Sequence, residues 1–353
     1  MDTLEPLAPL GGDEFAPAHT YLNTAACGLL PRRTADAVRR FTDQNAAGGP
    51  DGIGSLDSID HARALFARLA GVGPDRVAIG AAVSVHVALI AGSLPQGAEV
   101  LVPEGEFSSL VSPFAVRRDL RTRMVPLEDL AGAIRPGTAL VAFSAVQSAD
   151  GRTADLAAIR EAAAAHGTRT LLDATQSAGW LPLDAGAYDY TVTGTYKFLL
   201  CPRGATFLTV SEEAQETLVP LHAGWFAGEE VYDCYGPVRR FPPTARRFDE
   251  GPVLHAYQGA EQSLQLILEL GVDAIHAHDT ALAARFRDGL AALGHKPVPA
   301  DSSIVAVPGL GDRRAALAEA GVLTSARAGN LRAAFHLYNS SADVDRALRV
   351  LAD

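Results

Sequence analysis

The sequence lacks the cysteine pattern of a disulfide scaffold or a zinc site. Its three cysteines are Cys27, Cys201 and Cys234, so their number is odd, and no two of them form a CxxC pair. Paired cysteines are needed for a disulfide framework, and closely spaced ones are typical of zinc ligands. We therefore expect neither, and we predict no metal ligands.

Long apolar runs and basic clusters are also lacking. No segment approaches the roughly 20 apolar residues that a membrane-spanning helix needs, and residues 1–6 show no apolar run typical of a signal peptide. The basic residues are dispersed and the net charge is -11, which argues against a nucleic-acid binder. We expect a cytoplasmic protein that binds neither nucleic acid nor a membrane.

The pattern of apolar segments predicts an α/β fold. The 353 residues are 48% hydrophobic and 20% charged, which is ordinary for a globular enzyme with a sizeable core. Seven short apolar segments alternate with helical patterns, as in a mostly parallel sheet that helices cover on both faces. We expect the strands near residues 77–79, 100–102, 123–125, 139–143, 170–172, 190–192 and 205–210.

The two ends of the chain follow other patterns. The first 30 residues are interpreted as an irregular arm, after which Pro31 opens a helix. Beyond about residue 250, two long helical patterns lead into mixed strands and helices. We predict an N-terminal arm of residues 1–30, a large domain of residues 31–245 and a small α+β domain of residues 246–353.

Three polar side chains stand at the ends of two successive predicted strands. Asp173 and Gln176 follow one strand, and Lys197 follows the next. Ligands of open α/β sheets bind beyond these carboxyl ends. A lysine can form a Schiff base with pyridoxal phosphate (PLP), a carboxylate can keep its pyridinium nitrogen protonated, and an amide can reach its phenolic oxygen. Alone, Asp173 could equally be a helix N-cap, and Lys197 a surface lysine, but the apolar neighbours of Lys197 favour a desolvated, reactive amine.

A turn and a set of hydroxyls could hold the phosphate of that cofactor. The segment Gly80–Ser84 follows a predicted strand and opens a helix, whose free N–H groups suit an anion. A plain turn between strand and helix is the alternative. Ser84, Thr193 and Thr195 are candidate hydroxyl donors.

Two further side chains fit an amino-acid enzyme. Phe107 could stack on the pyridine ring, or it could be an ordinary core residue. Arg332 could bind the α-carboxylate of an amino acid through two hydrogen bonds. Arg327 could compete for that role, and a surface arginine on an edge strand is the alternative for Arg332.

Taken together, these segments resemble the class V aminotransferase family of fold-type I PLP enzymes. That family includes cysteine desulfurases, selenocysteine lyases, kynureninases and isopenicillin N epimerase-like proteins. The resemblance covers nearly the whole chain and implies a homodimer with active sites at the subunit interface. Its motifs here are Tyr21–Ala26, Gly80–Ala82, Glu106 with Phe107, Asp173–Gln176, Lys197 with Pro202–Gly204, Arg247–Gly251, Arg327–Gly329 and Arg332–Asn339.

The resemblance also implies a role for each residue. Lys197 is the Schiff-base lysine, Asp173 the pyridinium partner, Gln176 the phenolate-side contact, Phe107 the ring-stacking residue and Arg332 the carboxylate clamp. The remaining cofactor candidates are Ala82, Val83, Ser84, Thr193, Thr195 and Tyr196, and the remaining substrate candidates are Ala25 and Trp225.

Departures from the family pattern disfavour some of the reactions that the resemblance allows. Cysteine desulfurases carry a cysteine just after the motif that Arg327–Gly329 resembles, but here Asn330 follows, which disfavours a persulfide-forming desulfurase. The hydroxyls common in the phosphate turn are replaced by Ala81 and Ala82. A Gly-Thr pair that reaches the phosphate of the partner subunit reads Gly251-Pro252 here.

The expected function is a PLP-dependent reaction at Cα or Cβ of an amino-acid substrate. A carbanion at Cα, formed when Lys197 removes a proton, leads to β-elimination of the C–S lyase type or to transamination. We rank these two level and epimerisation third. A non-catalytic binding or scaffold protein of the same fold is the alternative from another class.

Overall fold

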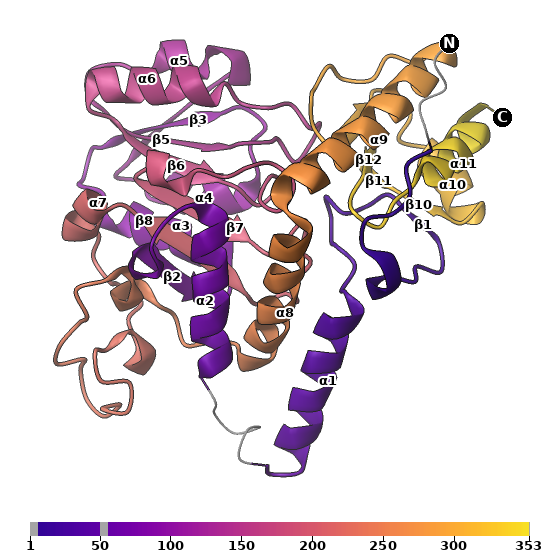
Figure 1. Ribbon diagram of the computed structural model, residues 1–353. Helices are drawn as coiled ribbons and strands as arrows, with labels where there is room; N and C mark the ends of the chain where they lie inside the picture. The colour runs from indigo at the N-terminus through magenta and orange to yellow at the C-terminus, as the bar shows by residue number, and fades with distance from the viewer. Residues whose placement is uncertain (1–5, 50–55, 353) are drawn as a thin grey trace.

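The computed structural model describes residues 6–49 and 56–352 and is built around one seven-stranded sheet (Figure 1). Its strand order is β2-β8-β7-β6-β5-β3-β4, and β8 pairs antiparallel with both of its neighbours while the other pairs are parallel. The expected mostly parallel, seven-stranded sheet is therefore confirmed. The strands are β2 (Val77–Gly80), β3 (Glu99–Pro103), β4 (Arg121–Val125), β5 (Thr138–Ser144), β6 (Arg169–Asp173), β7 (Tyr190–Gly194) and β8 (Thr206–Val210).

Helices cover both faces of this sheet because its strands are apolar on both sides. In β3, Val100 and Val102 pack in one cluster with the helices α3 and α4, while Leu101 packs in another with α5 and α6. The helices around the sheet are α1 (Arg32–Ala46), α2 (Asp57–Ala70), α3 (Val83–Ser93), α4 (Ser108–Ala115), α5 (Leu130–Ala133), α6 (Leu156–His166), α7 (Glu212–Thr217) and α8 (Leu254–Leu270).

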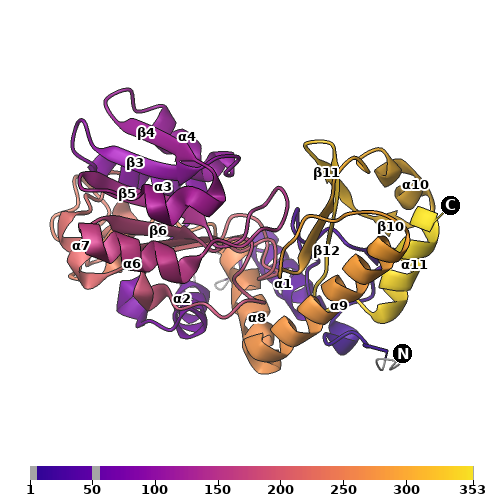
Figure 2. The same ribbon diagram turned by 90° about the horizontal axis from the view of Figure 1, so that it is seen from above.

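A second lobe forms the other end of the molecule (Figure 2). A three-stranded antiparallel sheet of order β11-β12-β9 packs with α9 and α11 around a separate apolar cluster that includes Phe286 and Phe335. The elements are α9 (Val272–Ala292), β9 (Ile304–Val307), α10 (Arg313–Glu319), β10 (Val322–Leu323), β11 (Ser325–Arg327), β12 (Asn330–Ala334) and α11 (Ser341–Ala352).

The N-terminal arm is more ordered than the sequence suggests. It contains the short strand β1 (Thr20–Tyr21), which pairs in parallel with β10, and Asn23 forms an isolated bridge with Ala334. The arm is thus attached to the second lobe. A two-residue strand has no periodic pattern, and its partner lies some 300 residues away, so no local feature of the sequence indicates the pairing.

Helix α8 packs with the large lobe rather than the small one. Its residues Tyr257, Leu264 and Ile267 share a buried cluster with Phe66 of α2 and Phe207 of β8. We therefore propose that the domain boundary expected at residues 245/246 lies instead between α8 and α9, where Gly271 (φ 84°) separates the two helices.

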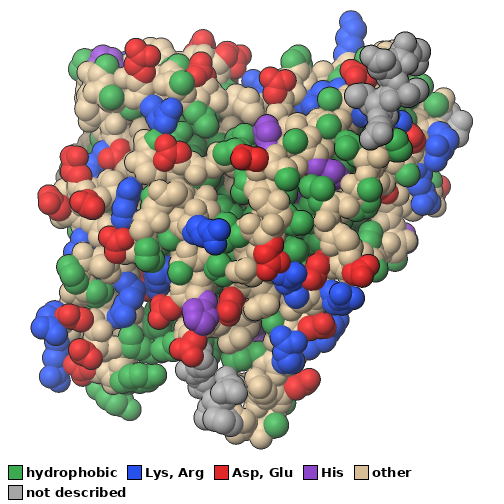
Figure 3. Space-filling model, in the orientation of Figure 1, with side chains coloured by type: hydrophobic (Ala, Val, Ile, Leu, Met, Phe, Trp, Pro, Cys, Tyr) green, Lys and Arg blue, Asp and Glu red, His purple; other side chains and the backbone are tan. Residues whose placement is uncertain are grey.

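The surface bears charges of both signs. On the face in Figure 3, acidic and basic side chains are interspersed over both lobes. Within the described residues, no helix combines the length and the apolar character that crossing a membrane requires.

Candidate active site

Polar side chains from several strands converge on one cavity of about 220 Å³ beyond the carboxyl ends of the parallel strands. Asp173 is the last residue of β6, Ser144 the last of β5, and Lys197 follows β7 by three residues. Parallel strands bring their carboxyl ends to the same edge of the sheet, where open α/β sheets bind their ligands. The cavity is lined by Ala81, Ala82, Val83, Ser84, Phe107, Ser109, Ser144, Ser148, Asp173, Thr175, Gln176, Tyr196, Lys197, Arg203, Gly204 and Thr206.

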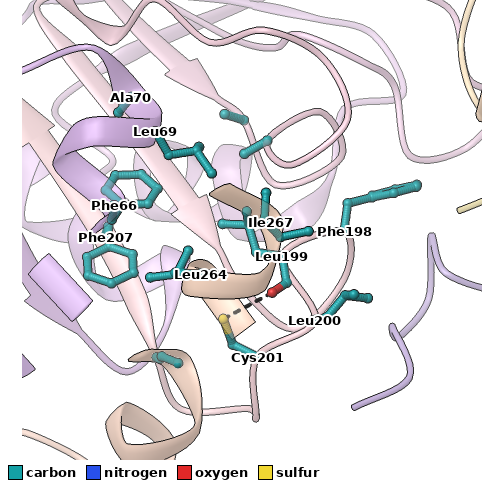
Figure 4. Close-up of a cluster of buried hydrophobic side chains, with 14 of the residues drawn as sticks. Phe66, Leu69, Ala70, Phe198, Leu199, Leu200, Cys201, Phe207, Leu264 and Ile267 are labelled. Atoms are coloured by element: carbon teal, nitrogen blue, oxygen red, sulfur yellow. Dashed lines mark hydrogen bonds between the residues drawn. The ribbon is translucent and has the colours of Figure 1, made fainter. Parts of the chain in front are cut away.

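Lys197 is anchored by the apolar residues that follow it. Phe198, Leu199 and Leu200 are buried and pack among residues of α2, β8 and α8 (Figure 4). Leu200 adopts a left-handed backbone conformation (φ 58°), which costs a bulky residue free energy and is retained only where the surroundings hold it. The tightly packed turn fixes the direction in which Lys197 leaves the backbone.

Two contacts from distant segments also hold this turn. His336, just after β12, lies with Nε2 2.9 Å from the carbonyl oxygen of Phe198 and with Nδ1 2.7 Å from the carboxylate of Asp279 in α9. From the N-terminal arm, the N–H of Gly28 donates to the carbonyl of Tyr196 at 2.9 Å. Both lobes and the arm therefore determine where Lys197 lies.

Burial makes Lys197 a reactive amine. The side chain is 4% exposed, and the loss of hydration lowers the pKa of its ammonium to about 8. The neighbouring charge of Asp173 acts in the opposite sense, while Arg332 and Arg203 lower the pKa further. A substantial fraction of Lys197 is neutral near physiological pH, as a nucleophile or a base requires.

Asp173 lies at the floor of the same cavity. Burial raises the pKa of its carboxyl, the backbone N–H of Thr175 opposes this by donating to Oδ1 at 2.8 Å, and the Glu106 charge raises the pKa further. The positive charge of Lys197 favours the ionised form. Asp173 is thus a buried carboxylate whose charge is stabilised by a cation in the cavity.

A chain of hydrogen bonds joins Gln176 to Arg332. The amide nitrogen of Gln176 donates to the hydroxyl of Ser148 at 2.8 Å, and Arg332 donates to the same hydroxyl at 3.2 Å and to the Ser148 carbonyl. Arg332 is 1% exposed, and burial lowers the pKa of its guanidinium to about 10, so it stays charged at neutral pH. Sequence reasoning missed Ser148, since a lone serine between strands carries no signal.

Phe107 reaches the cavity through a loop that Glu106 secures. The Glu106 carboxylate accepts hydrogen bonds from the backbone N–H and hydroxyl of Ser144, at 2.8 and 2.7 Å, and from the amide of Gln147 at 2.9 Å. The Phe107 ring is 41% exposed, and its centroid lies 5.1 Å from Nζ of Lys197. The sequence motif included Glu106, but its role in holding this loop was not foreseen.

The turn before α3 and the first residues of that helix line another part of the cavity. Ala82 precedes the helix, and Ala82, Val83 and Ser84 all line the cavity, as Tyr196 does. No side chain of the described residues caps α3, so its first N–H groups are available to an anion.

Other predicted residues lie away from the cavity lining. Thr193 is fully buried with its hydroxyl unpaired among the described residues, while the Thr195 hydroxyl donates to the Ala205 carbonyl at 2.7 Å. Trp225, 41% exposed, packs edge-on against Phe226. Ala25 contributes only its carbonyl, which accepts from Gln176 at 3.0 Å. In this chain alone, the predicted residues that do not line the cavity are Ala25, Thr193, Thr195, Trp225 and Arg332.

The residues present fit PLP. The buried Oε1 of Gln176 has no hydrogen-bond partner among the described residues, and Nζ of Lys197 has none either, so both are free to meet a polar ligand. An amine, a carboxylate, an aromatic face and an uncapped helix N-terminus stand in one cavity. This set defines an enzyme of the PLP-dependent, fold-type I class.

Comparison with known proteins identifies the family. The model of the family "Aminotransferase class-V" matches residues 20–347, so the chain belongs to the class V aminotransferases, and PLP is its cofactor. The uncharacterized aminotransferase YcbU of Bacillus subtilis is 28% identical, over 95% of this chain and 94% of its own. Isopenicillin N epimerase of Streptomyces clavuligerus is 30% identical, over 78% and 75%. The structure of the cystine C–S lyase C-DES superposes with a TM-score of 0.85 at 24% identity, over 95% and 98%, which confirms the fold.

Proposed function

We propose that this protein acts at Cα of a small α-amino acid, with Lys197 as the residue that holds PLP and moves the proton, and that the reaction is β-elimination or transamination. The observation that carries the proposal is the placement of Lys197 and Asp173, each 4% exposed, in one cavity. When bound, PLP supplies an aldehyde for the amino group and a ring that accepts the electrons released at Cα.

We assign the other roles in the reaction to individual residues in and beside the cavity. Lys197, neutral in part near pH 7 because of its lowered pKa, takes the proton from Cα and in elimination can pass it to the departing sulfur. Asp173 presents a carboxylate that favours a protonated ring nitrogen. Nη2 of Arg332 has no hydrogen-bond partner among the described residues, so it can bind the substrate carboxylate. Phe107 can cover one face of the ring.

The cysteines support a reaction that needs no protein thiol. None of them lines the cavity within the described residues. Cys201 is buried, and burial raises the pKa of its thiol to about 12, which makes it a poor nucleophile. β-Elimination can release a sulfur product directly, so the C–S lyase version of the proposal is compatible with this arrangement.

Epimerisation at Cα is the second candidate. It is favoured by the relative at 30% identity, an isopenicillin N epimerase. It needs the same proton removal, followed by return of a proton to Cα. A non-catalytic scaffold is disfavoured, because the cavity retains its lysine, carboxylate and amide, and Ser148 joins that amide to Arg332.

The test is a visible spectrum of the purified protein with PLP, before and after addition of alanine or cysteine thioethers, with product analysis. We expect an absorption band of the bound cofactor that Lys197→Ala abolishes and that borohydride traps on Lys197. Pyruvate and thiol identify elimination, the pyridoxamine form identifies transamination, and loss of optical activity identifies epimerisation. A protein that binds no PLP at all contradicts the proposal.

We also propose a homodimer. Trp225 is exposed, although the resemblance assigns it to the substrate pocket, and the cavity mouth is flanked by the exposed Phe107. Light scattering of the purified protein tests this, and a monomer at micromolar concentration would contradict it. The cytoplasmic location stays a prediction.

A further inference from the structure

The turn before α3 lacks the hydroxyl side chains that commonly hold a phosphate. At the start of α3 the turn presents Ala81 and Ala82, whose side chains cannot donate. The candidate hydroxyl of Thr195 is taken by a backbone carbonyl. Backbone N–H groups and hydroxyls such as those of Ser84, Thr175 and Thr206 remain in the cavity lining, and none of these carries a charge.

The segment that leads into β8 lies beside this turn. In the sheet, Thr206 at the start of β8 pairs with Gly80 at the end of β2, and only two residues separate Gly80 from α3. Arg203 and Gly204 precede Thr206, and all three line the cavity together with Ala82. The backbone that carries Arg203 is therefore close to the turn before α3, whereas Asp173 is at the end of β6.

Arg203 is held by an aromatic ring rather than by an acid. Its guanidinium carbon lies 4.0 Å from the centroid of the Tyr196 ring. No hydrogen bond or ion pair joins Arg203 to any described residue, and it is the one arginine among the described residues that line the cavity. Stacking on a ring uses the face of a guanidinium and leaves the N–H groups at its edges free to meet an anion.

An acidic side chain near the same turn adds negative charge, so a phosphate needs a cation beside it in order to bind there. Oε2 of Glu250 lies 3.4 Å from the backbone nitrogen of Ala81, so a carboxylate stands close to the place where a phosphate would bind. Burial raises the pKa of Glu250, and the charge of His222 opposes this. The N-terminus of α3 carries about half a positive charge, which is too little to offset both a phosphate and Glu250.

We infer that Arg203, stacked on Tyr196, binds the phosphate of the cofactor and replaces the missing hydroxyls of the turn. This role rests on the proposed function, since it assumes that PLP binds in the cavity. A guanidinium can donate two hydrogen bonds to one phosphate, which neutral hydroxyls cannot match in charge. Tyr196 serves as the platform that keeps the arginine aimed at the α3 end.

The test compares PLP with pyridoxal, which has the same ring and aldehyde but no phosphate. Equilibrium dissociation constants of both are measured by absorbance on the cofactor-free protein for wild type, Arg203→Gln and Arg203→Lys. We expect Arg203→Gln to weaken PLP about tenfold, the scale of a lost charge-assisted hydrogen bond at an exposed site, and to leave pyridoxal unchanged. Arg203→Lys should retain part of the preference, and inorganic phosphate should compete with PLP less well against Arg203→Gln.

Arg160→Gln is the matched control. Arg160 is also exposed and lies over a tyrosine ring, that of Tyr188 at 5.9 Å, but it does not line the cavity. We expect no change in either constant and the same thermal unfolding temperature for both Gln variants.

Three outcomes overturn the inference: equal weakening of PLP and pyridoxal by Arg203→Gln, no weakening of either, or the same loss in Arg160→Gln. Failure of the proposed function looks different, because the wild-type protein would then bind no PLP at any concentration used.

Discussion

The ionisation of Lys197 gives the sharpest prediction. Burial lowers its pKa from 10.5 to about 8, a shift that corresponds to about 3 kcal/mol against the ammonium form. At pH 7 a lysine of ordinary pKa is neutral in about one molecule in three thousand, and Lys197 in about one in ten. In the cofactor-free protein, the neutral fraction of Lys197 should therefore exceed the ordinary value about 300-fold.

The chain offers a direct assay because it contains two lysines, Lys197 and Lys296. The cofactor-free protein is treated with formaldehyde and borohydride at pH values from 6 to 11, and methylation of each lysine is followed by mass spectrometry. Access to the cavity limits the absolute rate at Lys197 but not the pH at which that rate levels off. We expect this inflection near pH 8, and Lys296, which is exposed, provides the internal reference.

Two variants test the sign of the electrostatic argument. The charge of Asp173 raises the pKa of Lys197 and that of Arg332 lowers it. Asp173→Asn should therefore move the inflection to lower pH, and Arg332→Gln should move it to higher pH. The reasoning is refuted if the wild-type inflection lies above pH 10, or if both variants move it in the same direction.

Two further predictions concern the stability of the fold. In Gly28→Ala, the new Cβ would lie 2.1 Å from the carbonyl oxygen of Lys197. We therefore expect a loss of about 1–3 kcal/mol of stability and weaker PLP binding, measured by denaturant unfolding and absorbance. Gly132→Ala in α5 is the control: among the described residues its new Cβ meets no atom within 4 Å beyond its own helix, and alanine suits a helix better than glycine, so neither stability nor PLP binding should fall. Asp249→Ala leaves the buried Arg63, which donates to that carboxylate at 2.7 and 3.0 Å, without its partner. We expect about 3–5 kcal/mol of destabilisation, and a loss below 1 kcal/mol would show that the pair is unimportant.

The sequence predicted the strands of the large sheet better than it predicted the shortest helices and strands. Except for the edge strand β4, whose residues are partly exposed, the strands from β2 to β8 are short, mainly apolar segments buried on both faces, and such segments stand out between turn residues. The short helices α5 and α7 were missed, because four to six residues cannot show a helical period. Strand β10, with two residues, was missed for the same reason.

The site residues that lie at or just after the end of a strand could be predicted from the sequence. Asp173 and Lys197 follow the strands β6 and β7, so topology alone brings them together. Thr193 belongs to β7, and its side chain is fully buried without lining the cavity, so its role at the phosphate stays a prediction. The role of Ser148 depends on Arg332, 184 positions away, and only the folded chain reveals such a contact.

The pairing of β1 with β10 has a consequence for the order in which the protein matures. The carbonyl of Ala25 and the N–H of Gly28 contact Gln176 and Tyr196 in the cavity, but the arm that carries them is fastened to residues 322 and 323. A ribosome makes those residues roughly 300 positions after the arm. The large sheet can form earlier, but the PLP cavity is completed only after β10 has been synthesised. Cofactor capture is thereby coupled to the synthesis of the small lobe.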